Sequence, residues 1–123
     1  MENPILSTVA DDGTAVVTVL GEIDFTNADE VSQGIREALA QWGPSVLRVD
    51  LKDATFIDST GLGALIEGYR TAIEAECRFV VVNPTKSFHR VLTVTGLCDL
   101  FGLAEPAVEE SGTSFAPSEA TGA

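Results

Sequence analysis

Residues 56–69 read FIDSTGLGALIEGY and mark the passage from a strand to a helix. An apolar strand is predicted just before them at 46–51, and a polar turn at 52–55 separates the two. The Asp-Ser-Thr sequence at 58–60 offers hydrogen-bonding side chains of the kind that satisfy the free amide groups of a first helical turn. Apolar side chains then recur at helical spacing and predict a helix that ends at about residue 75. These side chains are Leu62, Leu65, Ile66, Tyr69 and Ile73.

Three glycines of this predicted helix, Gly61, Gly63 and Gly68, lie away from its apolar stripe. A glycine in an exposed helix interior costs roughly 1 kcal/mol relative to alanine, so propensity alone makes this a poor helix. A closely approaching partner surface would favour the bare backbone. A phosphate beside the first turn would do so too, because the helix dipole favours negative charge there. We therefore expect the glycine-bearing edge, including Ala64, to be exposed, and we interpret Ser59 as a modification site on a docking surface.

The motif Asp58-Ser59-Thr60-Gly61-Leu62-Gly63 closely resembles the phosphorylation motif of bacterial anti-sigma factor antagonists, which are single STAS domains. The resemblance extends from about Val9 to Leu103, and includes the sequence GEID at 21–24 and the segment 87–97 that ends in Thr-Gly-Leu. It implies that the unmodified protein binds an anti-sigma factor that is also a serine kinase, and so frees a sigma factor. It further implies that the kinase phosphorylates Ser59, that the modified protein dissociates, and that a PP2C-type phosphatase resets it.

The resemblance also implies a partner-binding surface around the modified serine. The loop at 21–27 is expected to lie beside Ser59 and to help contact the kinase, which gives both Asp24 and Asp58 a place at the site. Without the resemblance, Asp58 is explained equally well as a helix cap and Asp24 as the end of a strand. The expected partner-binding residues are Asp24, Asp58, Ser59, Thr60, Gly61, Leu62, Gly63 and Glu67.

Predicted strands and helices alternate along the rest of the chain. This order predicts an α/β domain with a mixed β-sheet, an N-terminal β-hairpin and helices packed largely on one face. The resemblance adds the topology of a single STAS domain. The predicted strands are the hairpin strands at 5–10 and 14–20, a strand at 78–82 that is buried on both faces, and a short strand at 100–103. A helix is predicted over 28–41, with Thr26 or Asn27 as its cap. A second helix is predicted over 86–95; it ends at Gly96 and buries Phe88, Val91 and Leu92.

The length of 123 residues and the 45% hydrophobic content allow one modest core. We expect a STAS domain over 1–104 and an acidic, disordered tail over 105–123, where the composition changes to Glu, Pro, Ser, Ala, Thr and Gly. There is no long apolar run and no secretory leader in this sequence, so we expect a cytoplasmic monomer. The formal net charge of −12 argues against nucleic acid as a partner and favours a basic protein.

The sequence offers little chemistry for catalysis, metal binding or a cofactor. The single histidine, His89, lies inside an amphipathic segment and is expected to be solvated. Cys77 and Cys98 are too few and too far apart for a zinc site, and we expect reduced thiols, with a regulatory disulfide as the alternative. The sequence contains no nucleophile elbow and no phosphate-binding loop. We therefore expect a binding protein. The alternatives are a STAS scaffold or accessory subunit that is never phosphorylated, and a domain that senses a nucleotide or another small molecule.

Overall fold

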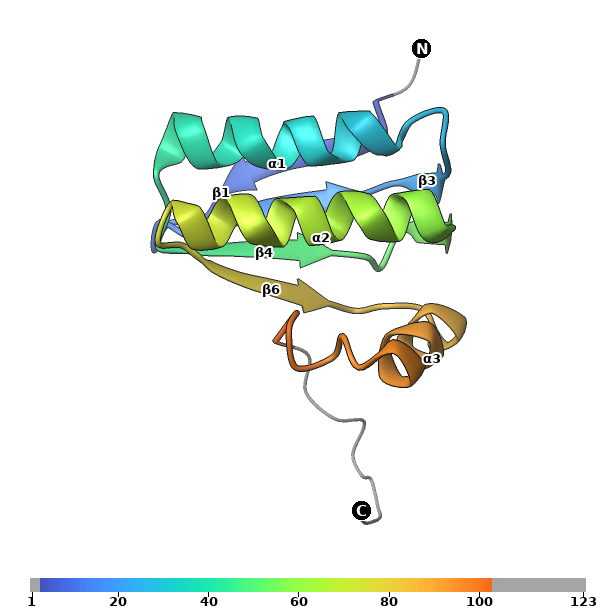
Figure 1. The fold of residues 1–123 in the computed structure, drawn as a ribbon. Helices are drawn as coiled ribbons and strands as arrows, with labels where there is room; N and C mark the ends of the chain where they lie inside the picture. Colours follow the sequence, from blue (N-terminus) through green and yellow to red (C-terminus); the bar gives the residue numbers. More distant parts are fainter. Residues whose placement is uncertain (1–2, 103–123) are drawn as a thin grey trace.

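A computed structural model describes residues 3–102 of the chain, which form the predicted hairpin, three helices and the strands at 46–50 and 78–82, together with two short strands that were not predicted (Figure 1). The expected acidic tail over 105–123 lies outside the described residues. The elements are β1 (Ile5–Val9), β2 (Ala15–Val19), β3 (Gly21–Ile23), α1 (Ala28–Trp42), β4 (Val46–Asp50), β5 (Ala54–Ile57), α2 (Ser59–Glu74), β6 (Arg78–Val82) and α3 (Lys86–Thr95).

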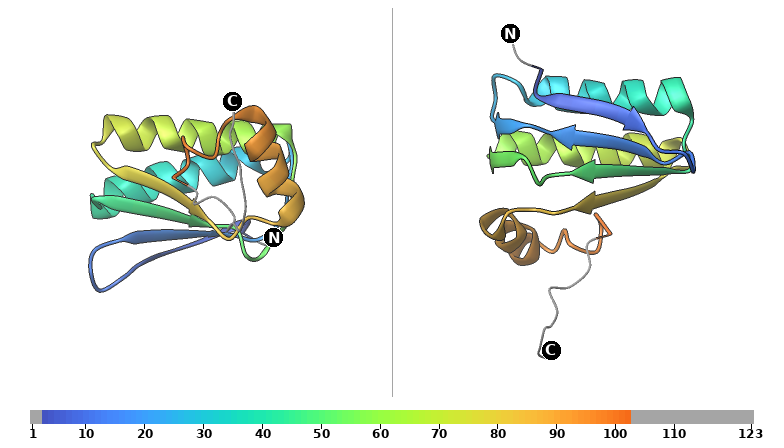
Figure 2. Two further views of the ribbon diagram at one scale, coloured as in Figure 1. Left: turned by 90° about the horizontal axis from the view of Figure 1, so that it is seen from below. Right: turned by 180° about the vertical axis from the view of Figure 1, so that it is seen from behind.

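The main sheet has four strands in the order β1-β2-β4-β6. The β1–β2 pair is the antiparallel hairpin, while β2, β4 and β6 run parallel to one another, so the sheet is mixed as predicted. Alternate side chains of each strand point to one face, where Val17, Val49 and Val81 are fully buried. Helices α1 and α2 lie side by side over this face (Figures 1 and 2), which confirms the predicted α/β fold class.

Strand β6 lies at one edge of the sheet, and its side chains are not buried on both faces as predicted. Phe79 and Val81 are buried, whereas Val80 and Val82 are half-buried. The predicted strand at 100–103 is also wrong, because the described part of this segment forms turns. One backbone hydrogen bond, from Val81 N to the carbonyl of Phe101 (2.8 Å), joins the segment to the edge of β6. The ring of Phe101 is fully buried, and its centroid is 5.7 Å from that of Phe79.

A second, two-stranded sheet pairs β3 with β5 in parallel, and the sequence patterns did not predict it. Residues 21–24 were expected to end the second strand, and residues 52–55 to form a turn. The structure pairs Ile23 with Ile57, and Asp58 N donates a hydrogen bond to the carbonyl of Ile23 (3.1 Å). This pairing brings the loop that follows β3 beside the first turn of α2.

The first helix, α1, follows the predicted pattern closely. Its apolar stripe of Val31, Ile35, Ala38 and Leu39 is buried against the sheet. The helix ends at Gly43, which has a φ of 50° and donates its N–H to the carbonyl of Leu39. The positive φ suits glycine, because a residue with a Cβ pays a steric penalty in this left-handed region.

The buried face of α2 differs from the predicted one. Leu65 is buried as expected, but Ile73 is 51% exposed, and Leu62, Ile66 and Tyr69 are only half-buried. The side of α2 that faces the domain is instead formed mainly by small residues. These buried residues are Gly61, Ala64, Leu65, Gly68 and Ala72.

Close packing inside the domain explains two of the three glycines. A Cβ at Gly68 would lie 2.7 Å from Cδ1 of Ile35 in α1, and a Cβ at Gly61 would lie 2.6 Å from Cγ2 of Ile57. The space next to Gly63 is open. The prediction that the glycine-bearing edge is exposed for a partner is therefore wrong for Gly61, Ala64 and Gly68, which are all buried. The surface that approaches them closely belongs to the protein's own core.

The last helix, α3, begins and ends where the sequence predicted. Thr85 caps it by accepting a hydrogen bond from Phe88 N (3.2 Å), and Gly96 closes it with a φ of 77°. Phe88 and Leu92 are buried, but Val91 is 42% exposed and does not point inward as expected.

Candidate functional site

The first turn of α2 is organised by the carboxylate of Asp58, which has an extended backbone and caps the helix. Its Oδ1 accepts hydrogen bonds from Thr60 Oγ1 (2.6 Å) and from Gly61 N (3.0 Å). These two bonds favour the charged form and hold the pKa of Asp58 below its ordinary value. The predicted capping role of Asp58 is confirmed, and the carboxylate is ionised at neutral pH.

Ser59 and Thr60 are both exposed, but their hydroxyl groups differ. The hydroxyl of Thr60 is bound to Asp58, whereas that of Ser59 makes no hydrogen bond to any residue in the range 3–102. The first intrahelical bond of α2 runs from Leu62 N to the carbonyl of Asp58. Within the same range the amides of Ser59 and Thr60 have no backbone acceptor. This turn therefore presents a free hydroxyl beside the positive end of a helix dipole, where an anion is stabilised.

The loop between β3 and α1 is a tight, hydrogen-bonded turn built on Asp24. The Oδ1 atom of Asp24 accepts from Thr26 N (2.9 Å) and Thr26 Oγ1 (2.5 Å), and its carbonyl accepts from the amides of Asn27 and Ala28. The side chain of Asn27 bonds to Asp24 N and to the carbonyl of Glu22 (both 2.9 Å). Asn27 therefore stabilises the turn. It precedes α1, but its side chain does not cap the helix, so this predicted cap is wrong. Because Asp58 N bonds to Ile23, the loop lies beside the first turn of α2 as expected.

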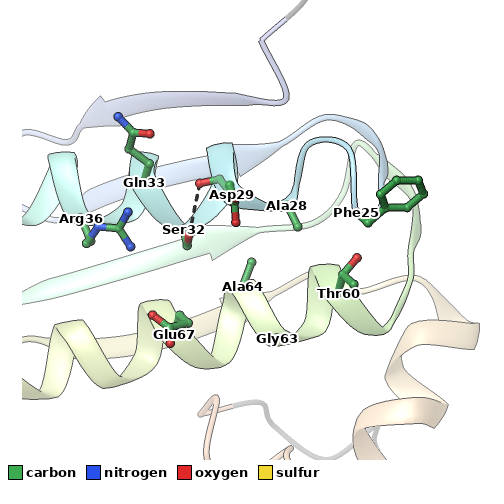
Figure 3. A pocket seen from close by; sticks show the side chains of 10 residues that line it. All are labelled: Phe25, Ala28, Asp29, Ser32, Gln33, Arg36, Thr60, Gly63, Ala64 and Glu67. Atoms are coloured by element: carbon green, nitrogen blue, oxygen red, sulfur yellow. Dashed lines mark hydrogen bonds between the residues drawn. The ribbon is translucent and has the colours of Figure 1, made fainter.

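An open groove runs between the N-terminal halves of α1 and α2 (Figure 3). Its floor is formed by small residues of the two helices, Ala28 and Ser32 of α1 and Gly63 and Ala64 of α2. Longer polar side chains form its rim, and Phe25 lies at the end where the loop and the first turn of α2 meet (Figure 3). The lining residues are Phe25, Ala28, Asp29, Ser32, Gln33, Arg36, Thr60, Gly63, Ala64 and Glu67.

The structure distributes the predicted site residues over three environments. Thr60, Gly63 and Glu67 line the groove, and Asp58 and Ser59 precede Thr60 at its end. Asp24 shapes the neighbouring loop through the hydrogen bonds given above. Two further residues lie deeper: Gly61 is buried against Ile23 and Ile57, and Leu62 is half-buried against the core.

The groove also contains residues that the sequence patterns did not single out, chiefly Phe25, Asp29, Gln33 and Arg36. Phe25 is 79% exposed. One signal was available in the sequence, because Phe25 is an aromatic residue within the polar run Asp-Phe-Thr-Asn and belongs to no predicted apolar stripe.

The described residues were also searched for a metal site and for a membrane-spanning helix. Among residues 3–102 no three His, Cys, Asp or Glu side chains lie together in a way that would hold a metal ion. No helix within that range is long and apolar enough to cross a membrane. Cys77 and Cys98 are buried and free, as expected, and His89 is half-buried, with its Nδ1 3.5 Å from Thr93 Oγ1.

Comparison with known proteins gives a consistent family assignment. The model of the STAS domain family matches residues 6–111. The anti-sigma-B factor antagonist of Bacillus subtilis (strain 168) is 30% identical over 88 residues, which cover 72% of this chain and 79% of the relative. The anti-sigma-B factor antagonist of Listeria monocytogenes is 28% identical over 98 residues, covering 80% of this chain and 85% of the relative.

Solved structures agree with the sequence comparisons. An anti-sigma factor antagonist from Mycobacterium paratuberculosis superposes with a TM-score of 0.65 at 31% identity, covering 89% of this chain and 92% of that one. The phosphorylated form of the Bacillus cell fate determinant SpoIIAA superposes with a TM-score of 0.63 over 94% of this chain and 92% of its own. At 18% identity, the likeness to SpoIIAA supports the fold alone.

Proposed function

The chain belongs to the STAS domain family, and from this premise we propose that it is an anti-sigma factor antagonist controlled by phosphorylation of Ser59. In its unmodified form it binds an anti-sigma factor that is also a serine kinase, and so releases a sigma factor. Transfer of a phosphoryl group from ATP to Ser59 ends the binding, and a PP2C-type phosphatase restores the unmodified form. The relatives named as anti-sigma factor antagonists support this proposal.

The observation that carries the proposal is the contrast between two neighbouring hydroxyl groups. Thr60 Oγ1 is 2.6 Å from the carboxylate of Asp58, whereas Ser59 is exposed and its hydroxyl has no partner in the range 3–102. Phosphorylation of Thr60 would require the Asp58–Thr60 bond to break and would weaken the cap of α2. Phosphorylation of Ser59 leaves the cap intact. The β-branched side chain of Thr60 is also the stiffer of the two.

A phosphate on Ser59 affects the stability of the domain and the stability of the complex differently. A phosphate adds about −1.5 to −2 charge. At the N-terminus of α2 the dipole and the free amides stabilise this charge, so the domain stays folded. In the complex, the phosphate would face the phosphate groups of the nucleotide that the kinase has just used. Repulsion between these like charges favours dissociation of the modified protein.

In this proposal the chain acts by binding and not by catalysis, as a cytoplasmic monomer. The residues proposed to take part in partner binding are those around the start of α2: Asp24, Asp58, Ser59, Thr60, Gly61, Leu62, Gly63 and Glu67. Gly61 and Leu62 contribute by fixing the shape of the turn, because their positions are buried or half-buried.

Phosphorylation in vitro tests the proposal directly. The wild-type chain, Ser59→Ala and Thr60→Ala are each incubated with ATP and the purified anti-sigma factor kinases of the source organism. Intact mass then reports how many phosphoryl groups each chain has gained. We expect one phosphoryl group on wild type and on Thr60→Ala, and none on Ser59→Ala. A phosphate mapped to Thr60 would disprove the assigned residue. An absence of phosphate with every kinase would favour the scaffold or the sensor alternative.

A further inference from the structure

We propose that residues 103–123 dock on the outer face of the chain's own four-stranded sheet, with Phe115 as the apolar anchor and the glutamates of the segment near Arg48 and Arg78. The outer face is the side of the sheet opposite α1 and α2. The side chains on it that carry the argument are Leu6, Val16, Arg48, Arg78, Val80 and Val82. The inference does not depend on the proposed function, because it involves neither Ser59 nor a partner protein.

The first support is the apolar character of this uncovered face. Strands β2, β4 and β6 run parallel to one another, and parallel sheets normally have both faces covered. In the right-hand view of Figure 2 the strands lie in front of α1 and α2, with no helix of the range 3–102 over them. Val16, Arg48 and Val80 are direct neighbours across three strands, and Val82 is two residues further along β6. Leu6 on β1 is 59% exposed. These aliphatic side chains offer an apolar surface that a further segment can cover.

The second support is the place where the described part of the chain ends. The hydrogen bond from Val81 N to the carbonyl of Phe101 (2.8 Å) holds the segment after α3 along the edge of β6. A Cβ at Gly102 would lie 3.6 Å from Cγ2 of Val80, a side chain of the outer face. Residue 103 therefore follows directly at the rim of this face.

The length of the segment is sufficient to cross the sheet. Phe115 follows Gly102 by 13 residues, which span at most about 43 Å when extended. The first and last of four strands are only about 14 Å apart. The segment needs no helix or strand of its own for this contact. Its covalent link gives it an effective concentration on the order of millimolar at the face, which favours it over a separate molecule.

The third support is the charge on the outer face. Residues 103–123 contain four Glu and no Lys or Arg, whereas the face presents the exposed side chains of Arg48 and Arg78. Two carboxylates lie near these arginines, that of Asp50 on β4 and that of Asp12 in the hairpin turn. Hydrogen bonds from Thr14 and, to a smaller extent, the charge of Arg48 lower the pKa of Asp12. The charges of the face thus balance in a chain whose formal net charge is −12. An acidic segment is not repelled here, and Arg78 in particular attracts its glutamates.

Phe115 is the aromatic residue of the segment and the part of it best suited to the aliphatic surface. An aromatic ring gains strongly from burial against apolar side chains. The model of the STAS domain family matches residues 6–111, so Phe115 lies beyond the part of the chain that the family shares. The anchor is therefore a property of this chain and is not inferred from its relatives.

Limited proteolysis of the full chain tests the charged contacts. A glutamyl endopeptidase cleaves after Glu109 and Glu110, and intact mass reports the rate of this cut. The double variant Arg48→Gln/Arg78→Gln is compared with Arg36→Gln/Arg70→Gln, which makes the same charge change on α1 and α2. A docked segment is cut only when it is released, so we expect the outer-face variant to be cut at least about fivefold faster than wild type, and the control variant less than about twofold faster.

Nuclear magnetic resonance of the labelled full chain tests the apolar contact. We expect nuclear Overhauser effects between the ring protons of Phe115 and the methyl groups of Val16 and Val80. Phe115→Ala should speed the cut after Glu109 and Glu110, whereas Ser114→Ala, a change at the neighbouring residue, should leave its rate within about twofold of wild type. Circular dichroism on each variant shows that faster cleavage is not a loss of fold.

Three results would overturn the inference. The first is an absence of Overhauser effects between Phe115 and the outer face. The second is an equal rate of cleavage in the two double variants, which would mean that Arg48 and Arg78 do not hold the segment. The third is a set of Overhauser effects found only between different chains in a mixture of labelled and unlabelled protein. That result would make a second copy the occupant of the face, in place of the chain's own segment.

Discussion

Two glycine-to-alanine changes in α2 test whether packing or exposure accounts for its glycines. Gly63→Ala and Gly68→Ala make the same chemical change in the same helix, five residues apart. Each gains roughly 1 kcal/mol of helix propensity. At position 63 the new methyl group meets nothing within 4 Å, so the whole gain should appear as added stability.

At position 68 the methyl group meets three atoms of the core. It would lie 2.7 Å and 3.2 Å from two carbons of Ile35 and 3.4 Å from the ring of Phe79. Ile35 is fully buried, so it cannot move away without disturbing its own neighbours. Overpacking of this kind costs about 1–3 kcal/mol. The propensity gain is common to both variants, so their difference isolates this packing cost.

Thermal unfolding followed by circular dichroism measures the difference. For a domain of this size, 1 kcal/mol shifts the Tm by about 4–8 °C. Gly63→Ala should unfold above wild type, and Gly68→Ala should unfold at least about 4 °C below Gly63→Ala. Equal melting temperatures for the two variants would refute the argument, since they would mean that Gly68 is not held by close packing against α1.

Four further predictions follow from the site and the core. Ser59→Asp should remain folded, because negative charge at the first turn suits the helix dipole, and should bind the kinase much more weakly; tight binding in calorimetry would contradict the switch. Asp58→Ala should lower the Tm at neutral pH, and its difference from wild type should shrink below about pH 4. The difference shrinks because the pKa of Asp58 is lower in the folded protein than in the unfolded chain. The carboxylate therefore contributes its full stabilisation above the unfolded-state pKa and loses it as the pH falls through the folded-state pKa. A difference in Tm that does not change with pH would argue against this role of Asp58. Phe101→Ala removes a fully buried ring and should cost about 3–5 kcal/mol in urea unfolding, whereas a small loss would show that this segment is dispensable. Cys77 should react slowly with iodoacetamide in the folded protein and quickly in denaturant, because burial shields the thiol and raises its pKa; rapid alkylation of the folded protein would contradict this.

The start of α2 was predictable as a capped turn, but the roles of its residues were not. The Asp-Ser-Thr order predicted a cap, and Asp58 provides it. The order did not reveal that the carboxylate also binds the hydroxyl of Thr60, which leaves Ser59 as the free hydroxyl. The two side chains differ by one methyl group. Which of them is engaged depends on local backbone geometry that a residue pattern does not specify.

The sequence by itself determined the elements that depend on near neighbours along the chain. The hairpin, α1, α3 and the left-handed closure at Gly96 were all predictable, because helical periodicity, strand alternation and glycine at a positive φ act over a few residues. Only the tertiary structure decided which side of α2 is buried, that β3 pairs with β5, and that Phe25 is left exposed. A glycine on a helix fits either an exposed face or a close contact, since it has no side chain to favour one of them. Gly68 is in close contact because Ile35, 33 residues earlier in the sequence, packs against it in the folded domain.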